Sequence, residues 1–240
     1  MELPMSPGMC KIKRLAVVLC GALAFSGLVA VPTAMAALPE FYKGANPIAA
    51  GAVINFTSAS EAAPEIKFPI TTNMTCTSAA DEGQTNGPKE VRNVFVHLKG
   101  CKKGLLGCKT PERGVANEEV VTHALRGVLV YLKKAAPTEV GMVYSPRLGG
   151  AAGVVTTYKC TGFPTQSIVG TVIGEVRPLN AEGREWKAIF EEMGGMQKFE
   201  KYENEVVAMP HHLVGCTGAL VLLDKEKITW EGMTEVKIMA

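Results

Sequence analysis

The sequence predicts an all-β fold, an antiparallel sandwich or barrel of short strands that is supported by disulfides. Apolar and polar residues alternate with a period of two along several short runs, as in strands with one buried and one solvated face. Glycine, proline and asparagine separate these runs, as expected of turns. Cysteines recur among the strand-like runs. These observations indicate a fold of many short strands.

Five runs carry the alternation, after an extended lead-in at 38–50. In the first run Phe68, Ile70 and Met74 face one way, whereas Lys67 and Thr71 face the other. The runs span 68–76, 91–99, 126–133, 153–160 and 227–238. Apolar residues that share a face in the later runs are Val94, Val96 and Leu98; Val128, Val130 and Leu132; Val154, Tyr158 and Cys160; and Ile228, Trp230, Val236 and Ile238.

The segment 180–194 fits two structures. As a helix it would be capped by Asn180 and ended by Gly194. As a strand over 184–192 it would turn at Gly194-Gly195 into a hairpin with 196–202. Periodicity alone slightly favours the helix, because four apolar residues follow its spacing. These residues are Trp186, Ile189, Phe190 and Met193.

The N-terminal segment has the layout of a secretory signal peptide. Lys11, Lys13 and Arg14 precede an uncharged apolar run, and Ala34-Met35-Ala36 matches a peptidase site. We therefore expect a leader at 1–36 and a single β-rich domain at 37–240. The alternative is an uncleaved anchor, since the apolar run is at the short limit of the roughly 17–25 residues that span a bilayer.

Composition excludes some classes of protein. The chain has 25 basic and 23 acidic residues, and removal of the leader leaves it close to neutral. A nucleic-acid-binding protein would show a basic face, and an acidic disordered tail is also excluded. About 200 residues follow the leader, enough for one all-β domain. We expect a secreted or cell-envelope protein with no contact to the membrane after cleavage.

Five cysteines follow the leader, and an oxidising compartment favours their pairing. Cys76 and Cys160 both lie on the apolar faces of their predicted strands, so we expect them to form one bridge. Cys101 and Cys108 flank a flexible connection and form the second, which leaves Cys216 free. The main alternative pairs Cys76 with Cys101.

The sharpest candidate for a metal site is the segment that contains His211, His212 and Cys216. Two imidazoles and a thiol within six residues could bind copper or zinc. Spacing supplies no third and fourth ligand for a tight site, however. A solvated loop before a strand with a buried thiol is the favoured interpretation, so no cofactor and no catalytic residue is predicted.

Other candidate motifs lack the residues or the geometry that their chemistry requires. The segment 104–110 lacks the glycines of a phosphate-binding loop, and no G-x-S-x-G serine elbow is present. Neighbouring residues of a strand point to opposite faces, so neither Glu118-Glu119 nor Glu191-Glu192 can act as a carboxylate pair. His97 and His123 are interpreted as ordinary strand histidines.

Seven stretches after the leader form a recognisable pattern. They are Ala37-Leu38-Pro39-Glu40-Phe41, Thr75-Cys76-Thr77, GPKEVRNVFVHLKGC (87–101), LRGVLVYLKK (125–134), EVG (139–141), VGTVIGEVRPLN (169–180) and VKIMA (236–240). With these stretches the chain resembles a group of small exported actinobacterial proteins, and the resemblance spans most of the chain after the leader.

The resemblance implies a strand at 184–192 and no particular activity or functional residue. It also implies that Cys216 is the unpaired cysteine, and this residue and the His211-His212 pair depart from the group's pattern. The group has cysteines at the positions of Cys76, Cys101, Cys108 and Cys160.

Two function classes remain. The first, which we favour, is a non-enzymatic secreted or envelope module whose loops bind a cell-wall, glycan or protein partner. The second is an extracellular hydrolase or metal-binding protein with a site assembled only in the fold. A deep pocket with at least three convergent titratable groups would favour the second class, and a shallow surface the first.

Overall fold

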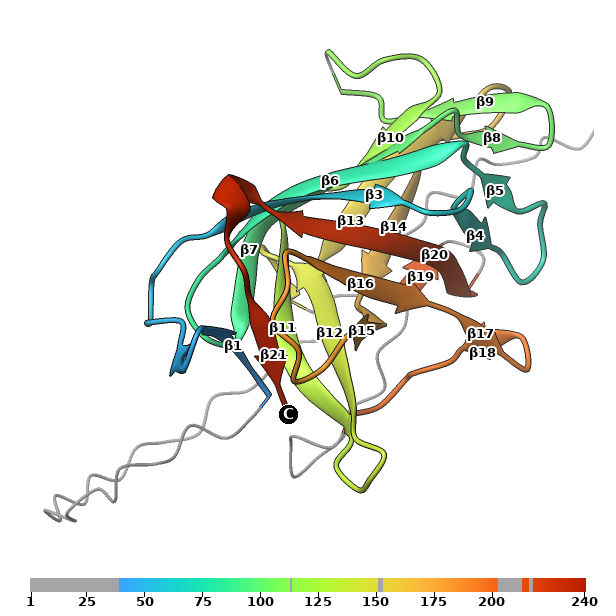
Figure 1. Ribbon diagram of the computed structural model, residues 1–240. Helices are drawn as coiled ribbons and strands as arrows, with labels where there is room; N and C mark the ends of the chain where they lie inside the picture. Colours follow the sequence, from blue (N-terminus) through green and yellow to red (C-terminus); the bar gives the residue numbers. More distant parts are fainter. Residues whose placement is uncertain (1–38, 113, 151–152, 203–212, 216–217) are drawn as a thin grey trace, which may run out of the picture. The chain divides into compact units, whose positions relative to one another are not determined.

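Eight strands close into an antiparallel barrel in the computed structural model (Figure 1). The structure describes residues 39–112, 114–150, 153–202, 213–215 and 218–240. The barrel strands are β3 (Asn55–Ser60), β6 (Ser78–Thr85), β7 (Glu90–Lys99), β11 (Leu125–Lys133), β12 (Glu139–Pro146), β15 (Val172–Arg177), β16 (Glu185–Phe190) and β20 (Gly218–Trp230). Each pairs with the next barrel strand along the chain, and β20 closes the ring between β16 and β3. The predicted all-β antiparallel fold is confirmed, as a barrel.

Along the barrel strands, alternate side chains point into the barrel and out of it. Along the second half of β20, Glu226, Ile228 and Trp230 are buried, while Lys225 and Lys227 are exposed. The inward face predicted for 227–238 is therefore confirmed. The single strand predicted there is wrong, because a 3-10 turn over Glu231–Met233 separates β20 from β21 (Lys237–Met239).

Glycines inside the barrel lie against large side chains. A Cβ atom added to Gly83 would lie 2.5 Å from the Phe56 ring, and one added to Gly174 would lie 2.7 Å from the Phe190 ring. Both distances are below van der Waals contact, so no larger residue fits at either glycine while the ring keeps its place. Pairing of small with large side chains is typical of the interiors of small barrels.

An aromatic cluster fills one end of the barrel. Phe41, on β1 (Glu40–Lys43), lies 6.2 Å from Trp186 and 5.7 Å from Trp230 between ring centroids. Phe56 lies 5.5 Å from Trp230. All four rings are buried, and β1 pairs with β21 beside them. The core is therefore densely filled at this end.

A second closed circuit of shorter strands shares β20 with the barrel. Its other members are β4 (Glu65–Lys67), β5 (Met74–Thr75), β8 (Lys102–Lys103), β9 (Leu106–Lys109), β13 (Val154–Cys160), β14 (Gln166–Gly170) and β19 (Leu213–Gly215). The first half of β20 pairs with β19 and β4, and its second half pairs with β16 and β3. One strand thus belongs to both circuits.

The remaining strands are short additions. β10 (Glu119–Val121) pairs with β7, and β2 (Asn46–Pro47) pairs with β1. β17 (Glu192–Met193) and β18 (Met196–Gln197) form the hairpin expected at Gly194-Gly195. The strand alternative for 184–192 is confirmed by β16, and the helix alternative is wrong.

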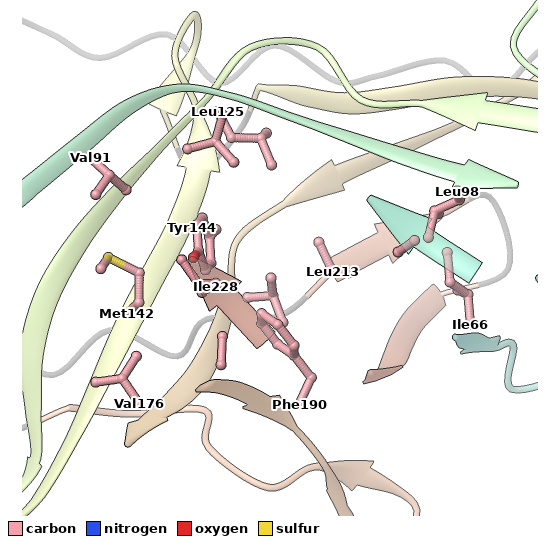
Figure 2. Packing of buried hydrophobic residues seen from close by; sticks show 14 of the residues in the cluster. Ile66, Val91, Leu98, Leu125, Met142, Tyr144, Val176, Phe190, Leu213 and Ile228 are labelled. Atoms are coloured by element: carbon pink, nitrogen blue, oxygen red, sulfur yellow. The ribbon is translucent and has the colours of Figure 1, made fainter. Parts of the chain in front are cut away.

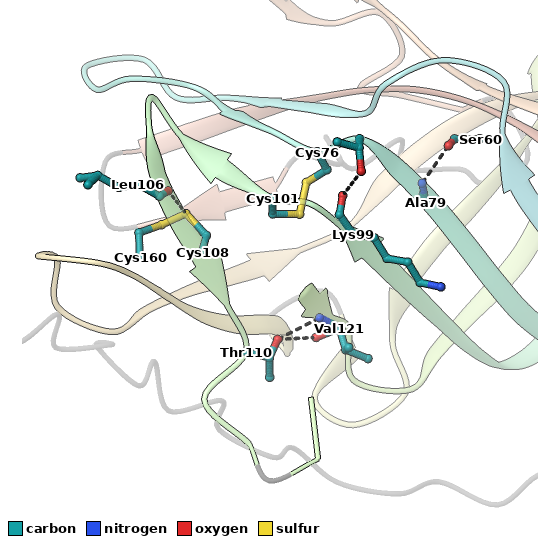
Figure 3. The surroundings of a disulfide bond; sticks show 11 residues. Ser60, Cys76, Ala79, Lys99, Cys101, Leu106, Cys108, Thr110, Val121 and Cys160 are labelled. Atoms are coloured by element: carbon teal, nitrogen blue, oxygen red, sulfur yellow. Dashed lines mark hydrogen bonds between the residues drawn. A yellow bond between two sulfur atoms is a disulfide. The ribbon is translucent and has the colours of Figure 1, made fainter. Parts of the chain in front are cut away.

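The two disulfides differ from the expected pairing (Figure 3). Cys76 is bonded to Cys101 and Cys108 to Cys160, so the predicted Cys76–Cys160 and Cys101–Cys108 bridges are wrong. The alternative pairing of Cys76 with Cys101 is the one found. The choice of these four cysteines as the bridged ones is consistent with the structure.

The register explains this pairing. The ladders β5–β8, β8–β9 and β9–β13 place the four cysteines in one row across neighbouring strands. Cys76 and Cys160 are the ends of the row, so three strand spacings of about 4.8 Å separate them. That separation exceeds the roughly 7 Å limit between Cα atoms for a disulfide.

Backbone hydrogen bonding explains why Cys101 is bonded to its neighbour Cys76 and not to its other neighbour, Cys108. The Cys108 N–H donates to the Cys101 carbonyl, with 2.9 Å between nitrogen and oxygen, so these residues form a hydrogen-bonded pair. In antiparallel ladders such pairs hold their Cα atoms about 5.5 Å apart, farther than non-hydrogen-bonded pairs. The bonded pairs have Cα–Cα distances of 4.0 Å (Cys76–Cys101) and 3.9 Å (Cys108–Cys160).

The strand predicted at 68–76 is wrong over most of its length, and only Met74–Thr75 forms β5. The Asn73 side chain accepts a hydrogen bond from the Phe68 N–H at 3.2 Å and donates one to Glu65 at 2.7 Å. These bonds bend the chain back on itself, and Ile70 is 77% exposed.

Both faces of β11 are apolar, which the alternation did not reveal. The main core receives Leu125 and Leu129. The face that the sequence predicted to be apolar includes Val130 and Leu132. Val130 forms a smaller cluster with Val143 and Ile173, and Leu132 packs against this cluster.

The predicted leader and the residues His211, His212 and Cys216 lie outside the described residues. Within the described residues, no helix has the length and apolar character needed to cross a membrane.

Candidate functional site

A largely apolar cavity lies inside the barrel. Figure 2 labels several of the side chains that line it, among them Ile66, Leu125 and Phe190. The cavity measures about 70 Å³ as the space open to the centres of water molecules. One water needs about 10–15 Å³ by this measure, so the cavity has room for several waters or a small organic group. Its apolar walls include Ile66, Leu98, Leu125, Ile168, Phe190 and Leu213.

Strands of both circuits build this cavity. Leu125 and Phe190 come from barrel strands β11 and β16, whereas Ile66 and Ile168 come from β4 and β14 of the second circuit. The cavity therefore lies where the second circuit covers the open end of the barrel.

Three carboxyl groups lie among these apolar walls. Asp81 on β6 is 8% exposed, and Asp224 and Glu226 on β20 are 7% and 4% exposed. The two β20 acids are two residues apart, so they share the inward face of that strand. Asp81 reaches them across β3, where its register partner is Ser58.

Burial perturbs all three acids. It raises the pKa of Asp81 to about 6, and polar neighbours such as Ser58 and the charge of His97 offset only part of this effect. Burial, followed by the negative charge of Asp81, raises the pKa of Asp224 to about 7. Burial and the charges of both aspartates raise the pKa of Glu226 well above its ordinary value.

These shifts set the charge of the cavity near neutral pH. The raised pKa values keep protons on the cluster that exposed carboxyl groups would lose, and the cluster gains negative charge in its apolar setting as pH rises through about 6 and about 7. Burial, followed by the charges of Glu226 and Asp81, also raises the pKa of Tyr144 well above its ordinary value, so its phenol stays neutral.

No positive side chain offsets this charge within the cavity. Among the described residues that line it there is no lysine, arginine or histidine. The Oδ1 atom of Asp81 is buried without a hydrogen-bond partner among the described residues, although Ser58 lies close enough to that side chain to lower its pKa. Buried polar atoms usually have partners, so this oxygen is a notable exception.

The two threonine hydroxyls of the cavity already make hydrogen bonds to the backbone. Thr122 accepts a hydrogen bond from the Val96 N–H at 3.0 Å, and Thr156 donates one to the Val121 carbonyl at 2.7 Å. Neither threonine is paired with a base, so the described lining contains no activated hydroxyl nucleophile.

No protein-family model, no curated protein and no solved structure matches the chain. Its function is therefore inferred from its own cavity and side chains.

The candidate metal ligands considered in the sequence analysis, His211, His212 and Cys216, lie outside the described residues. Within the part of the chain that the structure describes, no group of three or more histidine, cysteine, aspartate or glutamate side chains is arranged to hold a metal ion.

The adjacent acids act singly, as expected. Glu119 bonds to His97 at 2.9 Å, whereas Glu118 lies 3.5 Å from Lys102. In the second pair Glu191 and Glu192 likewise have different lysine partners.

Sequence reasoning missed Asp81, Asp224 and Glu226. A signal for two of them was present, since the alternation that places Ile228 and Trp230 inward also places Glu226 and Asp224 inward. No comparable signal marked Asp81, because the sequence of β6 contains few apolar residues.

Proposed function

We propose that this protein is a non-enzymatic, exported binding module whose barrel holds a small, mainly apolar ligand. The cavity within the barrel is the observation that carries the proposal. An eight-stranded barrel is just wide enough to be filled by side chains or to hold one small ligand. Ligand sites are typically concave, mostly apolar and equipped with a few placed polar groups, as here.

The two disulfides indicate an oxidising, extracytoplasmic environment, where such bonds form and persist. Export itself, to the medium or to the cell envelope, rests on the expected leader and is part of the proposal.

An enzyme that moves protons is the second candidate, because the pocket does bring three titratable groups together. Two carboxyl groups with separated pKa values can divide the roles of acid and base. However, Glu226 interacts directly with both Asp81 and Asp224. Glycosidases hold their carboxyl groups about 5–9.5 Å apart, with the scissile bond between them. The cluster leaves no such gap, so we rank binding above catalysis.

A cavity-filling variant tests the binding function. Benzene, followed by NMR of methyl groups that line the cavity, is expected to bind saturably to the unmodified protein. Ile168→Phe fills the cavity and is expected to abolish this binding, because Ile168 is a lining residue that is 2% exposed.

Ile70→Phe is the matched control, since Ile70 is 77% exposed and does not line the cavity. It is expected to leave benzene binding unchanged. Failure of the folded, unmodified protein to bind benzene or any other small apolar probe would overturn the proposed function.

A further inference from the structure

We propose that the ligand of the barrel is a small organic cation, a primary ammonium with an apolar group of about four carbons, whose nitrogen lies against Asp81, Asp224 and Glu226. This proposal rests on the proposed function and names the chemical class of its ligand.

The charge of the cavity selects a cation. A buried carboxylate without a partner is costly, because the apolar interior solvates it poorly. At another buried acid basic residues supply the opposite charge: Glu175 is only 3% exposed but contacts Arg177 and has Lys198 3.6 Å away. The three cavity acids have no such neighbour among the described lining residues. A cationic ligand would supply the missing charge.

The hydrogen bonding of Asp81 points the same way. Its side chain lines the cavity, and its Oδ1 atom is buried and accepts no hydrogen bond among the described residues. A primary ammonium carries three N–H donors, one for each carboxyl group. An anionic ligand would be repelled, and a neutral alcohol would leave the charge unpaired.

The size of the cavity limits the apolar part. At about 10–15 Å³ for each water-sized position, a space of about 70 Å³ holds roughly five to seven non-hydrogen atoms. Isobutylammonium has five, and its branched carbons suit walls of isoleucine, leucine and phenylalanine. A ligand this small is expected to bind no more tightly than about micromolar.

The proposal predicts a linkage between binding and protons. An ammonium ion favours the ionised forms of Asp81, Asp224 and Glu226, whereas burial raises the pKa values of all three and so favours their protonated forms. Binding near pH 7 should therefore release protons, and affinity should rise with pH. The other titratable groups that act on the cluster are Tyr144, which stays neutral, and His97, which is paired with Glu119.

Isothermal titration calorimetry of the exported chain with two probes tests this inference. Isobutylammonium and isobutanol have nearly the same shape and differ in charge. At pH 8 we expect the ammonium to bind at least tenfold more tightly than the alcohol. At pH 5.5 that preference should fall at least tenfold. Titrations at pH 7 in two buffers with different ionisation enthalpies should show proton release for the ammonium alone.

Two variants locate the effect. Asp224→Asn and Glu226→Gln should each reduce the preference for the ammonium to less than threefold while isobutanol still binds. Glu235→Gln is the matched control, because its side chain is 55% exposed near the end of the chain, and it should retain the full preference. If a cavity variant does not fold, the relative affinities of isobutylammonium and isobutanol for the unmodified protein still show whether the ligand is a cation.

The outcomes separate this inference from the proposed function. Equal affinity for both probes, or a preference that survives in both cavity variants, would overturn the cation and leave the binding barrel in place. Binding of benzene without binding of isobutylammonium would do the same. Absence of binding by every probe would overturn both.

Discussion

The buried acids make the protein less stable as pH rises, which is the reverse of the usual effect of carboxyl groups. Asp224 has a pKa raised from 3.8 to about 7 in the folded chain, so the folded state holds a proton that the unfolded state has already lost. Stability therefore falls between about pH 4 and pH 7, by on the order of 3 kcal/mol for this residue alone.

Guanidinium denaturation at pH 5 and pH 8 measures this effect. The unmodified protein is expected to be more stable at pH 5, and Asp224→Asn should lose a large part of that difference. The exposed substitution Glu235→Gln should keep the whole difference. An Asp224→Asn variant with the full pH dependence would show that burial of this carboxyl is not its cause.

Gly174 holds the Phe190 ring in the wall of the cavity. In Gly174→Ala the new methyl carbon would lie 2.7 Å from that ring, which must then shift. We expect a loss of about 1–3 kcal/mol in unfolding free energy, as for other overpacked cores. Gly183→Ala is the control, because its nearest heavy atom would be 3.7 Å away, and equal losses in the two variants would contradict this account.

At the level of elements, the cysteine row gives a prediction for disulfide mapping. After denaturation without reduction, cleavage at Lys102 and Lys103 separates Cys101 from Cys108. We expect mass spectrometry to find the peptide with Cys76 joined to that with Cys101, and the peptide with Cys108 joined to that with Cys160. A peptide pair that joins Cys101 to Cys108 would contradict the observed register.

The two bridges should also differ in their contributions to stability. They close loops with sequence separations of 25 and 52 residues. In the chain-entropy model these loops correspond to about 3.5 and 4 kcal/mol, so loss of Cys108–Cys160 should cost slightly more. Thermal denaturation of the two double serine variants measures both values.

Strands with a local sequence signal could be predicted, whereas features that depend on contacts between distant parts of the sequence could not. β7 and β13 were predicted because their alternation is a local signal. β16 remained ambiguous, since its apolar spacing fits a helix as well, and pairing with β15 and β20 makes it a strand. The disulfide partners depended on a register across four strands, which no local pattern contains.

For the whole molecule, the alternation predicted an antiparallel β fold but could not separate a sandwich from a barrel. Both architectures bury one face of each strand, and the difference is whether β20 returns to β3. That contact joins residues far apart in the sequence. The cavity was unpredictable for the same reason, because its walls come from both circuits.

A single cooperative unfolding transition is expected, because the two circuits share a strand. Trp186 and Trp230 report on the aromatic end, whereas far-ultraviolet circular dichroism reports on all strands. The fluorescence and dichroism midpoints in guanidinium should coincide. Two separated midpoints would show that the circuits unfold independently.

The shared strand also restricts how the chain can evolve. Loops such as 68–73 can gain or lose residues at little cost, but a single insertion or deletion within β20 would reverse the orientation of every side chain beyond it. An insertion just before Asp224 would exchange Asp224 and Glu226 with exposed lysines, and it would put the ladders to β3 and β16 out of register with those to β4 and β19. Descendants of this chain should therefore vary in loop length while keeping the spacing along β20 fixed.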